Sequence, residues 1–133
     1  KINIESISNI GSNAFKGCNK ITSISFPLSV KTIGSNAFQS CSKLNSISWG
    51  GVTTINSNAF SDCIALESVT LPSQVNINSQ AFSSCSKLKT VRYEGVRNPE
   101  TCSEDAFQST GMEYIEVAME YEEQVDNVYV LKK

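Results

Sequence analysis

The 133-residue chain contains no histidine, only two arginines and one tryptophan, and no long run of apolar residues. Without histidine, an enzyme's usual general base, a common zinc ligand and every Cys–His dyad are missing. No stretch approaches the roughly 18 apolar residues that a membrane-spanning helix requires. The basic residues also lack the arginine clusters with interleaved aromatic residues that favour nucleic-acid binding. We therefore expect a domain with no direct membrane insertion, no nucleic-acid partner and little catalytic equipment.

Charge is distributed unevenly along the chain, although the net charge is only −2. Residues 1–93 carry eight basic and three acidic residues, a balance of +5, whereas residues 94–133 carry three basic and ten acidic residues, a balance of −7. Such an asymmetry can steer a charged partner, although a solvated face followed by an acidic tail is its more common meaning.

Repetition dominates what the chain does contain. The segment IGSNAFKGCNKITSISFP begins at Ile10, near copies begin at Ile33, Ile55 and Ile77, and a shorter copy begins at Cys102. Units of this length cannot bury an apolar face alone, so they are expected to stack into a solenoid. The predicted organisation is a single domain over residues 1–133, with a partial first coil at 1–9, repeats at 10–32, 33–54, 55–76 and 77–101, a degenerate last repeat at 102–117, and a C-terminal cap or tail at 118–133.

Each unit is expected to contain a helical turn and a strand. In the second unit, Ala37, Phe38 and Cys41 fall on one side of a short helical turn. The alternation of Ile47 and Trp49 predicts a strand whose apolar side chains point inward. Stacking then places equivalent residues in buried columns, such as the phenylalanine column Phe15, Phe38, Phe60, Phe82 and Phe107. The predicted fold is a right-handed α/β-type solenoid of about five coils, with parallel strands on its concave face and helical turns on the other side.

The repeat follows the pattern I-x-S-x-A-F-x-x-C-x-x-L-x-x-I-x-[F/W/L/Y]-[P/G/E], with valine two or three residues later. This pattern resembles the BspA-like leucine-rich repeat of bacterial and protozoan-parasite surface proteins, and it covers residues 1 to about 117 in four near-complete copies. The resemblance implies a leucine-rich repeat solenoid and a role in adhesion to host matrix proteins or cells. Val52 stands where the more familiar leucine-rich repeat carries Asn or Cys, so functions of other repeat types do not transfer.

Four cysteines recur at one position of the repeat, and a fifth, Cys102, stands where the other units have isoleucine. A structural zinc site needs four converging ligands, whereas a column that follows the solenoid diverges. Disulfides are disfavoured because stacked cysteines have parallel Cβ vectors. A nucleophilic thiol would lack a histidine to activate it. We interpret the repeated cysteines as small apolar plugs, and expect no metal, no cofactor and no enzymatic activity; they are Cys18, Cys41, Cys63 and Cys85.

The outward-facing strand residues are the candidate binding surface. Three units offer only Ser and Thr there, whereas the last two bring together Arg92, Tyr114 and Glu116, and Tyr and Arg are frequent interface anchors. The insertion RNPET in the fourth unit adds a surface loop. A wettable face and a loop without function are the alternatives. The predicted protein-binding residues are Lys89, Thr90, Arg92, Arg97, Asn98, Glu113, Tyr114 and Glu116.

The sequence thus predicts a non-enzymatic protein-binding module, a fragment of an adhesin-like cell-surface or secreted protein that binds host or matrix proteins. An intracellular scaffold of the same architecture, located in the cytoplasm, is the alternative. At the N-terminal end, Ile2, Ile4 and Ile7 would be exposed on the first coil, which predicts an edge capable of self-association.

Overall fold

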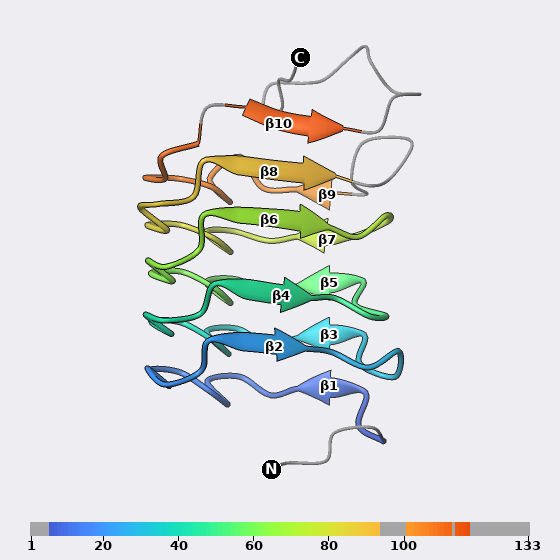
Figure 1. Cartoon of the computed structure of the whole chain (residues 1–133). Helices are drawn as coiled ribbons and strands as arrows, with labels where there is room; N and C mark the ends of the chain where they lie inside the picture. The colour runs from blue at the N-terminus through green and yellow to red at the C-terminus, as the bar shows by residue number, and fades with distance from the viewer. Residues whose placement is uncertain (1–5, 94–100, 113, 118–133) are drawn as a thin grey trace.

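The computed structural model describes residues 6–93, 101–112 and 114–117, which wind into a right-handed solenoid of parallel strands (Figure 1). Each turn contributes one very short strand and one longer strand. The very short strands are β1 (Asn9–Ile10), β3 (Thr32–Ile33), β5 (Thr54–Ile55), β7 (Asn76–Ile77) and β9 (Thr101–Cys102). The longer strands are β2 (Ser23–Ser25), β4 (Ser46–Ser48), β6 (Ser68–Leu71), β8 (Thr90–Tyr93) and β10 (Tyr114–Val117). The predicted parallel-strand solenoid is confirmed.

The strands stack in two series along the solenoid (Figure 1). The very short strands form one five-stranded sheet, whereas the longer strands form a two-stranded sheet, β2–β4, followed by a three-stranded sheet, β6–β8–β10. Ile33 pairs with Ile10 and Ile55, and Val91 pairs with Val69, so equivalent residues of successive repeats lie side by side. From β1 to β9 the chain makes four full turns, and the predicted count of about five coils includes the partial turn that ends at β10.

Between each very short strand and the next longer strand runs a segment that we call the turn ribbon, residues 11–18 in the first coil. A helical turn was predicted here, and that prediction is wrong, because no helix occurs in the part of the chain that the structure describes. Alternate N–H groups bond in different directions. Ala14 N–H donates to the Gly11 carbonyl of its own coil (3.2 Å), and Phe15 N–H donates to the Ala37 carbonyl of the next coil (2.7 Å). The ribbon therefore turns within its own coil while it stacks on its neighbour as a strand does.

Backbone torsion angles explain why the ribbon is not helical. A right-handed helix needs negative φ throughout, but each ribbon holds left-handed residues. The first such position is occupied by Asn13, Asn36, Asn58 and Gln80, with φ between 58° and 63°. The second is occupied by Gly17, Ser40, Asp62, Ser84 and Ser109, with φ between 61° and 74°. Asn, Asp and Gly, which tolerate this conformation better than other residues, occupy five of these nine positions. The left-handed residues make tight turns and prevent a continuous helix.

Aromatic side chains form the centre of the core. The rings of the predicted phenylalanine column stack with centroids 5.1 to 5.4 Å apart, along Phe15, Phe38, Phe60, Phe82 and Phe107. A second buried column lies at the ends of the longer strands and comprises Phe26, Trp49, Leu71 and Tyr93. Phe60 has no exposed surface, so its truncation to Ala is expected to cost about 3 to 5 kcal/mol.

The first coil is less well covered than the next one. Phe15 and Cys18 are only partly buried, whereas their equivalents one coil later are fully buried. Ile7 is 37% exposed. Ile2 and Ile4 lie outside the described residues, so self-association through this edge stays a prediction.

The corner that follows β4 packs closely on the backbone of the corner that follows β2. Gly50 has a φ of 59°, and a Cβ at this position would overlap the main-chain carbonyl of Phe26. A Cβ at Gly51 would overlap the carbonyl of Leu28. The two glycines therefore allow a two-residue corner where coils meet backbone to backbone.

We expect Gly50→Ala to lower the free energy of unfolding by about 2 kcal/mol or more. Left-handed backbone costs an L-residue about 1 to 2 kcal/mol, and steric overlap adds to that. Gly11→Ala is the matched control, because Gly11 is exposed and a Cβ there would meet nothing within 4 Å. Urea unfolding followed by circular dichroism measures both variants. Equal losses in the two would contradict this explanation.

Between the last two coils of the turn ribbon, a carboxylate replaces a main-chain carbonyl as the hydrogen-bond acceptor. Asn58 N–H donates to the Ser79 carbonyl one coil later (3.1 Å), but the equivalent N–H of Gln80 donates to Asp105 Oδ1 (3.2 Å). The same carboxylate accepts hydrogen bonds from the hydroxyls of Ser103 (2.7 Å) and Ser79 (3.0 Å). These bonds, with the Ser103 bond the strongest cause, hold the pKa of Asp105 below its ordinary value.

Because its pKa is lower in the folded than in the unfolded chain, Asp105 stabilises the fold above its ordinary pKa of 3.8. This contribution is lost as the pH falls through the lowered folded value. We therefore expect Asp105→Asn to be less stable than the wild type at neutral pH, and the difference to disappear in acid. Urea unfolding over a series of pH values measures this, with Glu104→Gln as the control for loss of a neighbouring carboxylate. A difference that does not change with pH would contradict the assignment.

Candidate protein-binding face

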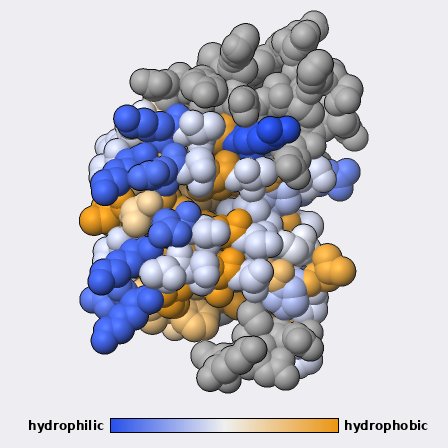
Figure 2. All heavy atoms as spheres, viewed as in Figure 1, coloured by the Kyte–Doolittle hydropathy of each residue, from blue (hydrophilic) through white to orange (hydrophobic). Residues whose placement is uncertain are grey.

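The outer surface of the longer strands is covered by small hydroxyl side chains over most of its length. Inward and outward residues alternate along each strand, so that Val69 is buried while Ser68 and Thr70 beside it are exposed. The equivalent residues Ser23, Ser25, Ser46 and Ser48 are exposed as well. Figure 2 shows a pale band of such residues over the middle of this face. Three coils therefore present hydroxyl groups that can hydrogen-bond a partner but offer no large anchor.

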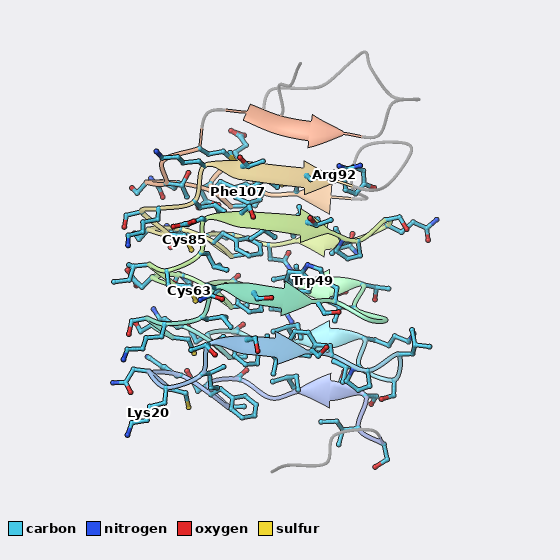
Figure 3. The ribbon with its side chains drawn as sticks, in the orientation of Figure 1. Lys20, Trp49, Cys63, Cys85, Arg92 and Phe107 are labelled. Carbon is cyan, nitrogen blue, oxygen red and sulfur yellow. The ribbon has the colours of Figure 1, made fainter. Side chains whose placement is uncertain are left out.

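At the C-terminal end of the sheet the residue types at the equivalent strand positions are different. In the β8–β10 register, Tyr114 pairs with Thr90, and Glu116 pairs with Arg92. Lys89 is exposed just before β8. Arg92 is exposed as well and lies toward the carboxyl end of β8 (Figure 3). The structure thus brings four of the predicted residues to neighbouring positions of β8 and β10 and places Lys89 just before β8, whereas Arg97, Asn98 and Glu113 lie outside the described residues.

This arrangement suits recognition more than reaction. Paired residues on neighbouring strands are about 5 Å apart, so the register places Arg92 next to Glu116. Guanidinium groups form forked hydrogen bonds with carboxylates, and tyrosine rings contribute contact area at little entropic cost. The register therefore aligns cation, anion and aromatic residue types at neighbouring positions of β8 and β10.

The repeated cysteines take part in the contacts between coils. Cys63 and Cys85 lie on one side of the solenoid (Figure 3). The Cys63 thiol donates to the carbonyl of Phe38 (3.2 Å), and the Cys85 thiol donates to that of Phe60 (3.2 Å). The Cys41 thiol makes the same bond, at 3.2 Å, in the coil before. The interpretation of the repeated cysteines as apolar plugs was therefore incomplete, because these three thiols also donate hydrogen bonds to the backbone of the preceding coil.

Burial keeps these thiols protonated. It raises the pKa of Cys41 and Cys63, and raises that of Cys85 to about 12. The thiolate is the form that attacks substrates and binds metals, so it is scarce here at neutral pH. Within residues 6–93, 101–112 and 114–117, no group of three His, Cys, Asp or Glu side chains is placed to hold a metal ion, and none of the five cysteines forms a disulfide bond. The thiol column therefore contributes to structure in the described part of the chain.

We expect Cys63 and Cys85 to react with a maleimide more than about a hundredfold more slowly in the native protein than in urea, because thiolate is scarce and access is blocked. Cys18 and Cys102, which are only partly buried, are expected to react sooner. Peptide mapping by mass spectrometry after timed labelling measures each site. Rapid modification of native Cys63 would show that the column is accessible and would contradict this assignment.

Comparison with known proteins identifies the repeat. A profile of the BspA type leucine-rich repeat region, in six copies, matches residues 2–129. The chain belongs to the BspA-type leucine-rich repeat family. The resemblance that the repeat pattern predicted is therefore confirmed. A search of curated proteins finds no match.

Solved structures agree with this family assignment. A leucine-rich cell surface protein of Faecalibacterium prausnitzii superposes with a TM-score of 0.73 at 28% identity over 84% of this chain. The T. pallidum leucine-rich repeat protein superposes with a TM-score of 0.72 at 28% identity over 82% of this chain. The pneumococcal vaccine antigen PcpA, with a TM-score of 0.62 at 21% identity over 86% of this chain, shows likeness of fold alone. This chain spans 30%, 51% and 36% of those three proteins, respectively.

Two features of this BspA-type chain were not predicted from its sequence. The hydrogen bond from the thiol to the preceding coil has only a weak signal in the sequence, which is that each repeated cysteine follows the phenylalanine of its repeat by three residues. The fifth unit shows that position alone is not enough, because Thr110 Oγ1 donates to the Phe107 carbonyl of its own coil (3.0 Å). The left-handed ribbon has a clearer signal in the recurring Asn before Ala-Phe. In the part of the chain that the structure describes, no helix has the length and apolarity needed to cross a bilayer.

Proposed function

We propose that this chain is a non-enzymatic module of a cell-surface or secreted protein, and that it binds a protein ligand through the outer face of β8 and β10. The observation that carries the proposal is the β8–β10 register, which pairs Arg92 with Glu116 and Thr90 with Tyr114. Binding energy in protein interfaces is concentrated in a few residues, among which Arg and Tyr are enriched. On a face that otherwise bears hydroxyl groups, this end supplies such anchors.

The surface location rests on similarity. One relative of known structure, from Faecalibacterium prausnitzii, is described as a leucine-rich cell surface protein and shares 28% identity with this chain. The net charge of +5 over residues 1–93 and −7 over residues 94–133 would add long-range steering to the encounter with a charged partner. An adhesin-like role, with host or matrix proteins as ligands, follows from this location and from the family.

The non-enzymatic assignment rests on the chemistry of the repeat. The chain has no histidine, and burial raises the pKa of the thiols at Cys41, Cys63 and Cys85. The small hydroxyl groups on the outer face of β2, β4 and β6 have no histidine to activate them. Recognition, rather than bond making, is the function that these groups support.

The test is a pull-down from a solubilised extracellular-matrix extract and, in parallel, from a cytosolic extract. The captured protein is then purified and its Kd measured by surface plasmon resonance. We expect Arg92→Ala and Tyr114→Ala each to weaken binding by about thirtyfold, which is the effect of losing an anchor worth about 2 kcal/mol. Ser25→Ala, at the far end of the same face, is the control and is expected to leave the Kd unchanged.

Circular dichroism of each variant confirms that a weaker Kd does not arise from unfolding. Binding that is unaffected by both anchor variants would place the contact elsewhere on the molecule. Selective capture from the cytosolic extract would favour an intracellular scaffold over an adhesin.

A further inference from the structure

A row of lysines follows the corner between the turn ribbon and the longer strands. Three of them stand two residues after the repeated cysteine, in the first, second and fourth coils, and two more flank them in sequence. All five are exposed. We call these residues the lysine row: Lys16, Lys20, Lys43, Lys87 and Lys89.

The lysine row lies along one edge of the face described above. Lys20 projects from the left side of the solenoid in Figure 3, and strongly hydrophilic residues gather along that same edge in Figure 2. Neighbouring coils stack about 4.8 Å apart where strands pair, so Lys20 and Lys43 stand on adjacent levels and Lys87 stands two levels further along. The positive charges are therefore arranged in a line along the solenoid axis.

The fold does not account for this line of charge. None of the five lysines makes an ion pair with another residue in the described part of the chain, and like charges on neighbouring levels repel one another. The third coil interrupts the row, because Ala65 stands in the place of lysine and Asp62 and Glu67 are exposed nearby. Five positive charges against two negative ones still leave this corner basic.

We propose that the lysine row binds a linear sulfated polysaccharide. Ammonium groups are compact point charges that pair with sulfate groups, and an extended chain lying along the axis can meet several levels at once. Ser23 and Ser46 begin β2 and β4 beside the row, and their exposed hydroxyls can hydrogen-bond sugar hydroxyls. The proposal adds a second surface and does not depend on the protein-binding face.

Other polyanions fit this corner less well. Single-stranded nucleic acids need aromatic platforms for their bases, but the clustered aromatic rings of the described chain stack in the core. An acidic protein partner would be bound mainly through Arg or aromatic anchors, and the lysine row contains neither. A membrane surface needs apolar side chains to insert, and Ile64, 45% exposed, is the large apolar residue in this corner within the described chain.

The first experiment measures binding of a heparin-derived oligosaccharide by isothermal titration calorimetry. The variant combines Lys20→Gln, Lys43→Gln and Lys87→Gln, and leaves Lys89 in place because Lys89 also adjoins the protein-binding face. Each exposed ion pair corresponds to roughly two- to fivefold in affinity, so we expect at least about a tenfold loss and a shallower dependence on salt. Lys31→Gln, at a different corner of the solenoid, is the control for loss of one charge and is compared with Lys43→Gln alone.

The second experiment fills the gap in the row. Ala65→Lys restores a lysine at the position where the other coils carry one, and is expected to raise the affinity by about two- to fivefold. Ser73→Lys adds the same charge to the same coil at its exposed Pro-Ser-Gln corner, and is expected to change the affinity less. A gain at Ala65 and not at Ser73 separates a positioned row from a general effect of net charge.

Several results would overturn the proposal. These are absence of binding by the wild type, equal effects of Ala65→Lys and Ser73→Lys, or equal binding of a fully desulfated oligosaccharide of the same length. Tighter binding of polyglutamate, single-stranded DNA or phosphatidylserine vesicles would assign the row to another class of partner. Loss of protein binding by Arg92→Ala has no bearing on these measurements, so the two surfaces can fail independently.

Discussion

Hydrogen bonds between successive coils hold every repeat in register with the next. The bond from the Phe15 N–H to the Ala37 carbonyl (2.7 Å) recurs one coil later between Phe38 and Ala59 (2.8 Å). Because these bonds connect equivalent positions, each buried side chain packs against its own counterparts above and below. A change at an inner position therefore disturbs two coil interfaces at once, which is why the inner residues of the repeat are so uniform.

The same stacking leaves the outer positions free of packing constraints. Ser48 and Thr70 occupy equivalent exposed positions, and a guanidinium takes that place at Arg92. Along the neighbouring corner, Lys43 is followed one coil later by Ala65. Substitutions of this kind alter the surface without altering the fold. Binding surfaces on such a solenoid are consequently rows along its axis rather than pockets, and they suit partners that extend over several coils.

Stacking also decides the chemistry of the repeated cysteine. Four thiols at equal spacing in a sequence could indicate a metal site or a disulfide framework. In the solenoid each buried thiol instead meets the phenylalanine carbonyl of the preceding coil, as Cys85 meets Phe60 at 3.2 Å. Burial then raises the pKa and removes the reactive form. The fold thus converts a potentially reactive residue into a structural one.

The sequence by itself determined the repeat period, the inner columns and the pairing of equivalent residues, because periodicity and polarity are local properties of the chain. Only the tertiary structure decided the path of the turn ribbon and the partners of Cys63 and Asp105. These depend on bonds between residues 25 positions apart, between Cys63 and Phe38 and between Asp105 and Gln80. A helical turn satisfies the spacing of Ala37, Phe38 and Cys41 equally well. The neighbouring coil excludes it, because alternate N–H groups must point along the axis to bond there.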